Sequence, residues 1–69
     1  MTILRALAGN PSTPVEVLKN LSEDSYDVRQ NLAGNPGATP EILEELAQDL
    51  HQYVRASVAE NPATPEKLF

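Results

Sequence analysis

The chain repeats one short phrase three times, and this repetition is the strongest constraint on how it can fold. The phrase reads LAGNPSTP from Leu7 to Pro14, LAGNPGATP from Leu32 to Pro40, and VAENPATP from Val58 to Pro65. Its Asn-Pro pairs begin at Asn10, Asn35 and Asn61, with steps of 25 and 26 residues. Self-similarity at such a period is the signature of stacked repeat units, so we expect a solenoid.

Apolar residues outside the phrase follow the same step. The recurring sets are Ile3, Val28 and Val54; Leu7, Leu32 and Val58; and Ala8, Ala33 and Ala59. A period of this length suits two short helices with tight corners. No segment alternates apolar and polar residues as a half-buried strand does, so the sequence predicts no β-sheet.

The first helix of each unit is indicated by a Thr-Pro pair. We expect Thr13, Thr39 and Thr64 to act as N-caps, each followed by a proline at the first helical position. In the middle unit the apolar residues recur at helical spacing, at Leu43, Leu46, Ala47 and Leu50. This pattern predicts an amphipathic helix of two to three turns.

The second helix of each unit is expected to be shorter and to end at the Asn-Pro pair, because proline disfavours the α conformation in the preceding residue. Asp24 and Asp49 are its predicted N-caps. Asn10, Asn35 and Asn61 are expected to bond turn backbone, with a ladder from unit to unit as one arrangement. Gly37 is interpreted as the extra residue of the middle turn, where it absorbs a one-residue insertion.

Two consecutive motifs carry a family resemblance. They are Val28-Arg29-x-x-Leu32-Ala33-x-Asn35-Pro36 and Thr39-Pro40-Glu41-x-Leu43-x-x-Leu46-Ala47-x-Asp49. The chain resembles the leucine-rich repeat variant family, whose bacterial members stack an α-helix and a 3₁₀-type helix per repeat into a right-handed superhelix without β-sheet. The first unit departs from the pattern, because Leu4 aligns with the recurring arginine.

The resemblance implies an all-α, right-handed helical-repeat solenoid of about two and a half repeats of about 25 residues. We expect one domain over residues 1–69, with units at roughly 1–11 (partial), 12–36, 37–62 and 63–69 (partial). Some relatives carry a cysteine-ligated iron–sulfur module, but this chain has no cysteine, so no cofactor and no metal site are expected.

The recurring arginines, Arg29 and Arg55, allow two interpretations. A row of guanidinium groups could hold an acidic peptide or phosphates. Alternatively, each arginine pairs with a nearby acid, Asp24, Asp27 or Asp49, and ties neighbouring units together. We favour the structural role, because ion-pair networks commonly account for such residues and the net charge is wrong for phosphate capture.

The remaining ring side chains are interpreted as structural. His51 is the single histidine, and with no cysteine beside it we expect a surface residue at a helix start rather than a metal ligand or a general base. Tyr26 and Tyr53 both lie just before a Val-Arg pair, which suggests shared corner packing or a binding edge.

Charge and composition narrow the function. Ten acidic and five basic residues give a net charge of −5, which repels nucleic acid and anionic membranes. The sequence contains no apolar membrane span and no leader, so we expect a cytoplasmic protein. No residues form a catalytic motif, and the sequence predicts a non-enzymatic repeat scaffold that mediates protein–protein interaction. The alternative is a nucleic-acid-associated helical-repeat protein or a fragment of a larger enzyme.

The two ends of the chain fall inside repeat units. We hypothesise that these half-units complete each other between chains, which would give a homo-oligomer. The alternative is that the missing halves belong to a longer protein.

Overall fold

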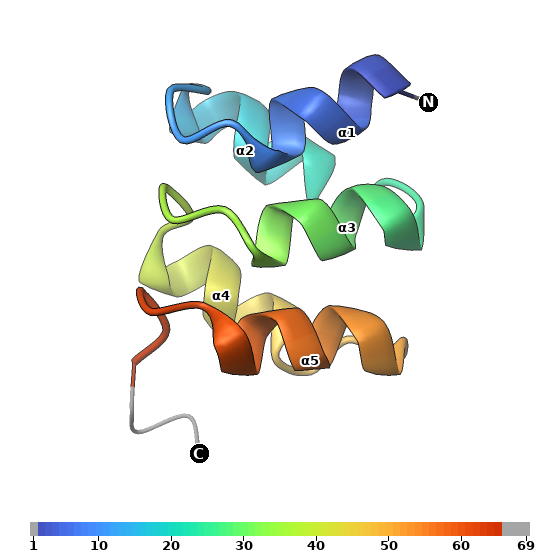
Figure 1. Cartoon of the computed structure of the whole chain (residues 1–69), viewed down its shortest axis with the longest axis vertical. Coiled ribbons are helices and arrows are strands. Elements are labelled where there is room, and N and C mark those ends of the chain that lie inside the picture. Colours follow the sequence, from blue (N-terminus) through green and yellow to red (C-terminus); the bar gives the residue numbers. More distant parts are fainter. Residues whose placement is uncertain (1, 66–69) are drawn as a thin grey trace.

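The computed structural model describes residues 2–65, which form five α-helices and no β-strand. The helices are α1 (Thr2–Gly9), α2 (Val15–Leu21), α3 (Tyr26–Ala33), α4 (Pro40–Leu46) and α5 (Gln52–Glu60). Figure 1 shows α1, α3 and α5 side by side along the long axis of the molecule, with α2 and α4 in a second layer behind them. The middle helix α3 packs against α1 on one side and α5 on the other. The predicted all-α fold is confirmed.

The second helix of each pair is not shorter than the first, and the prediction on this point is wrong. α2 and α4 have 7 residues each, whereas α3 has 8 and α5 has 9. Nor do residues 2–65 contain a 3₁₀ helix. The fully buried side chains of Val28 and Leu32 explain why α3 is an α-helix and not a 3₁₀ helix. An α-helix places positions i and i+4 on one face, whereas a 3₁₀ helix would separate them by about 120°.

The core consists of small and medium apolar side chains from both layers. Its buried members are Ala8, Leu18, Leu21, Val28, Leu32, Ala33, Ala38, Ile42, Leu43, Leu46, Val54 and Val58. The predicted apolar face of the middle long helix needs one correction, because Leu50 is 98% exposed and Ile42 is buried. Since α4 ends at Leu46, Leu50 lies beyond the helix and the heptad spacing does not apply to it. None of the helices described is both long and apolar enough to cross a bilayer.

The buried side chain of Asn35 connects one turn to the previous one. Its Oδ1 accepts the backbone N–H of Gly37 at 2.7 Å, which closes the local turn. Its Nδ2 donates to the carbonyl oxygens of Ala8 at 2.8 Å and Asn10 at 3.1 Å, 27 and 25 residues earlier in the chain. An amide buried in this way needs all these partners, because an unsatisfied polar group would cost about 1–3 kcal/mol.

Asn61 makes the same contacts one step further along. Its Oδ1 accepts the N–H of Ala63 at 2.9 Å. Its Nδ2 donates to the carbonyl oxygens of Ala33 at 2.7 Å and Asn35 at 3.0 Å. The asparagines therefore form the ladder from turn to turn that the repeated Asn-Pro pairs indicate.

Gly37 is not an extra residue of the middle turn, and that prediction is wrong. Ser12, Gly37 and Ala63 each donate their backbone N–H to the asparagine two residues before them, so the three occupy equivalent positions. Glycine is needed at position 37 for a different reason. A Cβ atom there would lie 2.9 Å from the carbonyl oxygen of Pro11, which is too close for a side-chain carbon.

The extra residue is Leu50, in the corner between α4 and α5. In the first corner the N–H of Ser25 binds the carboxylate of Asp24, the residue directly before it. In the second corner the N–H of His51 binds the carboxylate of Asp49, two residues before it. Leu50 has no counterpart in the first corner, and it is accommodated by extending into solvent.

The Thr-Pro pairs do not all begin a helix in the same way. Thr39 caps α4 as expected, because its Oγ1 accepts the N–H of Ile42 at 3.3 Å. Thr13 does not cap α2, whose N-cap position is taken by Pro14. The hydroxyl of Thr13 instead donates to the carbonyl oxygen of Leu7 at 2.7 Å.

Thr64 behaves like Thr13, since its hydroxyl donates to the carbonyl oxygen of Val58 at 2.6 Å. The helix that it was expected to cap would begin at Pro65, and the prediction therefore falls on residues 66–69, outside the described part of the chain. Spacing explains the difference. Thr13 and Thr64 stand three residues after their turn asparagine, where they reach the end of the preceding helix, whereas Thr39 stands four residues after Asn35.

Replacing Thr39 with alanine should lower the free energy of unfolding by about 1 kcal/mol, because the N–H of Ile42 loses its side-chain acceptor. Thr39→Ser keeps a hydroxyl acceptor and should remain close to the parent. Urea denaturation of the three proteins measures the difference. An alanine variant as stable as the parent would refute the capping role.

Candidate functional site at the corner before α5

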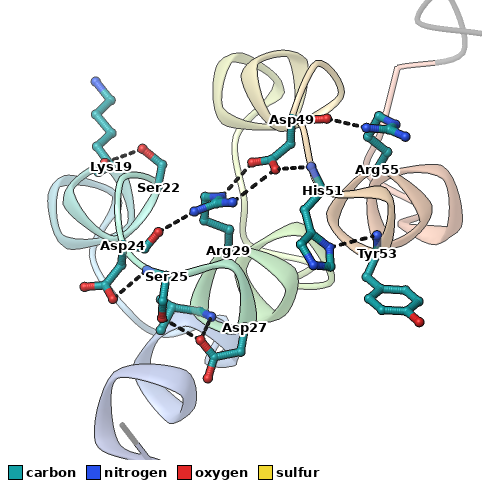
Figure 2. A network of polar contacts seen from close by, with 11 residues as sticks. Lys19, Ser22, Asp24, Ser25, Asp27, Arg29, Asp49, His51, Tyr53 and Arg55 are labelled. Atoms are coloured by element: carbon teal, nitrogen blue, oxygen red, sulfur yellow. Dashed lines mark hydrogen bonds and ion pairs between the residues drawn. The ribbon is translucent and has the colours of Figure 1, made fainter.

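Arg29 occupies the centre of a polar network that joins the two corners (Figure 2). Its Nε donates to Asp49 Oδ2 at 2.6 Å, and its NH2 donates to Asp49 Oδ1 at 3.1 Å. Its NH1 donates to the carbonyl oxygen of Asp24 at 2.5 Å. The guanidinium therefore makes a two-point contact with a carboxylate, the geometry in which arginine pairs are strongest. The expected pairing with a corner acid is present for this arginine.

Asp49 is held in its charged form by three donors. Partial burial raises the pKa of its carboxyl group, but hydrogen bonds from Arg29 and from the N–H of His51 outweigh this effect. The net result is a pKa below its ordinary value of 3.8. The side chains of Asp49 and Arg29 are 10% and 23% exposed, so solvent screens the pair less than it would a surface ion pair.

Arg55 repeats only half of this arrangement. Its NH1 donates to the carbonyl oxygen of Asp49 at 2.6 Å, as that of Arg29 does to Asp24. No carboxylate of residues 2–65 reaches its Nε or NH2, so the acid pairing expected for Arg55 is not present in the described part of the chain. The reason is positional, because Arg29 takes its carboxylate from the corner after the next helix, and residues 2–65 contain no such corner beyond α5.

The predicted N-caps Asp24 and Asp49 are both wrong, because the caps are Ser25 and His51. Each aspartate carboxylate accepts the N–H of the cap residue itself rather than one from the first helical turn. Asp27 adds a further contact, accepting the hydroxyl of Ser25 at 2.5 Å and the N–H of Val28 at 3.0 Å. The hydrogen bond from Ser25 lowers the pKa of Asp27 below its ordinary value.

His51 lies between two tyrosines. As the N-cap of α5, it accepts the N–H of Tyr53 at its Nδ1, at 3.3 Å. Its ring stacks on that of Tyr26 with centroids 4.0 Å apart and planes 5° from parallel, and the ring of Tyr53 lies 5.2 Å away. Tyr26 and Tyr53 are 47% and 54% exposed. We call these three residues, together with the adjacent Leu50, the aromatic corner.

No group of three or more histidine, aspartate or glutamate side chains within residues 2–65 could hold a metal ion. A surface hollow with a volume of about 300 Å³ lies between α2 and α4. It is lined by Lys19, Ser22, Glu23, Glu41, Ile42 and Glu45. This hollow shares no residue with the aromatic corner.

Paired helices in two layers, joined by equivalent asparagine turns, define a helical repeat protein. The family profile described as "Leucine Rich Repeat Variant domain" matches residues 2–52, about three quarters of the chain. The chain therefore belongs to the leucine-rich repeat variant family. Comparisons with curated proteins and with solved structures gave no match.

Sequence reasoning missed Leu50 as the inserted residue of this corner, although a signal was present. Asp24 follows Asn10 by 14 residues, and Asp49 follows Asn35 by the same number. The aspartate-to-arginine distance then grows from 5 residues to 6 in the second corner. Counting from the aspartates, rather than comparing the repeated phrases, places the extra residue in this corner.

Arg29→Met should lower the free energy of unfolding by about 2 kcal/mol, because it leaves the partly buried Asp49 carboxylate without its two guanidinium donors. Arg55→Met removes the same charge but only one hydrogen bond at an exposed site, and it should cost less than about 1 kcal/mol. Chemical denaturation of both variants measures the contrast. Equal losses would show that the Asp49 contact adds nothing.

Acid should destabilise the parent more than the Arg29→Met variant. The pKa of Asp49 is lowered in the folded state, so its contribution is complete above its ordinary value of 3.8 and is lost as the pH falls through the folded-state pKa. Without the arginine, the carboxyl group titrates closer to its ordinary value and the pH dependence weakens. Unfolding free energies measured from pH 6 downward test this, and parallel profiles would contradict it.

Proposed function

We propose that this chain is a non-enzymatic repeat scaffold that binds another protein. In this proposal its helices continue as a right-handed superhelix of about two and a half repeats, with units near residues 1–11, 12–36, 37–62 and 63–69. Membership of the leucine-rich repeat variant family and the equivalent turns at Asn35 and Asn61 support the repeat organisation. Repeat proteins of this kind commonly use exposed side chains on a rigid stack for recognition.

The observation that carries the proposal is the composition of the aromatic corner. The equivalent first corner has Ser25 and Asp27 where the second corner has His51 and Tyr53, and it has no counterpart of Leu50. The two corners share two hydrogen bonds, one from the N–H of the cap residue to the aspartate carboxylate and one from an arginine to the aspartate carbonyl oxygen. Packing of the repeat therefore does not require the rings of His51 and Tyr53 or the exposed Leu50.

The aromatic corner offers a defined type of contact. Stacking on Tyr26 fixes the plane of the His51 ring, so little side-chain freedom is lost when a partner binds. Tyrosine is enriched at interfaces because it combines a large apolar ring with a polar end. With a net charge of −5 on the chain, a partner that brings apolar side chains next to basic residues fits this surface best.

The double variant Leu50→Ser/Tyr53→Ser should lose the bound partner without losing stability, because both side chains are more than half exposed. Val15→Ser, which removes a 40% exposed apolar side chain from α2, is the matched control. Proteins captured from the source cells by the parent and both variants are compared by quantitative mass spectrometry, alongside thermal melts. The proposal fails if the double variant captures the same proteins as the parent.

A further inference from the structure

The helices α1, α3 and α5 form a row in which each contact repeats the previous one (Figure 1). At each step the asparagine after one helix donates its Nδ2 to two carbonyl oxygens at the end of the helix before it. The same contact buries an alanine of the earlier helix, and Ala8 and Ala33 are both fully buried. Each helix of the row therefore has two different sides. On its acceptor side, carbonyl oxygens receive the asparagine amide that follows the next helix of the row. On its donor side, the asparagine that follows the helix itself donates to the previous helix of the row.

The acceptor side of α5 is exposed in the described structure. Ala59 stands at the position of Ala8 and Ala33, but it is exposed rather than buried. Its carbonyl oxygen and that of Asn61 are the counterparts of the Ala33 and Asn35 oxygens that bind Asn61. No side chain of residues 2–65 donates to either of them.

The donor side of α1 is exposed as well. Asn10 closes its own turn by accepting the N–H of Ser12 at 2.9 Å, but none of residues 2–65 accepts a hydrogen bond from its Nδ2. Beside it, Ile3 and Leu7 are 71% and 38% exposed, at the positions where α3 has the fully buried Val28 and Leu32. This side is therefore apolar and carries a pre-positioned amide donor.

We propose that the donor side of α1 in one copy of the chain docks on the acceptor side of α5 in a second copy. Asn10 Nδ2 then donates to the carbonyl oxygens of Ala59 and Asn61, which continues the ladder across the interface. The contact repeats the side-by-side packing of α3 on α5. A second copy is the occupant because it supplies both the amide donor for these oxygens and the exposed apolar side chains of Ile3 and Leu7 that can cover Ala59. Association is head to tail, since the two sides differ.

Two variants each block one side of this contact. Asn10→Asp keeps an oxygen that can accept the N–H of Ser12, so the local turn is retained, but it has no N–H to donate and brings a negative charge toward two carbonyl oxygens. Ala59→Gln places a long side chain where the equivalent alanines are covered. Asn20→Asp, on the exposed end of α2, makes the same charge change away from both sides and is the control.

Sedimentation velocity over a wide concentration range is the measurement, with thermal melts to show that every variant is folded. The parent and Asn20→Asp should associate with rising concentration, and Asn10→Asp should weaken association at least about tenfold. A mixture of Asn10→Asp and Ala59→Gln should form a 1:1 dimer and nothing larger, because one intact contact remains between them. A parent that stays monomeric, an Ala59→Gln variant that associates normally, or a mixture that stays monomeric would each overturn the proposal.

Discussion

The arrangement of the helices depends on the buried amide of the turn asparagine. The carboxamide of Asn35 is fully shielded from water, yet it must satisfy an acceptor and two donor hydrogens. Only one arrangement meets all three requirements, with the oxygen closing the local turn and the nitrogen bonding the end of the previous helix. Because the penalty for an unpaired buried amide exceeds the gain from one hydrogen bond, neighbouring turns have little freedom to slide.

The opposite end of α3 is held by a second and chemically different contact. Arg29 binds the carbonyl oxygen of Asp24 before its own helix and the carboxylate of Asp49 in the next corner. A short helix held at both ends can neither rotate nor shift along its axis without breaking a polar contact. This restraint matters in a chain of 69 residues, because the core within residues 2–65 contains only small and medium apolar side chains and no buried aromatic ring.

Periodicity was sufficient to predict the fold class, the two-helix units and the asparagine ladder, because each follows from residues that recur at a fixed step. It failed where a residue's role depends on what lies beside it in space. Thr13 and Thr39 belong to identical Thr-Pro pairs, yet a one-residue difference in spacing makes the first a donor to a helix end and the second a cap. The stacking of His51 on Tyr26 joins residues 25 positions apart, and no local pattern indicates it.

The position of Leu50 shows how this architecture tolerates changes in chain length. The residues before it are positioned by Asp49 and those after it by the cap of α5, so the additional residue alters neither set of contacts. In most small folds a single inserted residue changes the direction in which every later side chain points. Here the shift is absorbed within one corner, which makes that corner a natural place for the chain to acquire longer loops, and with them new specificities, while the stacked helices stay unchanged.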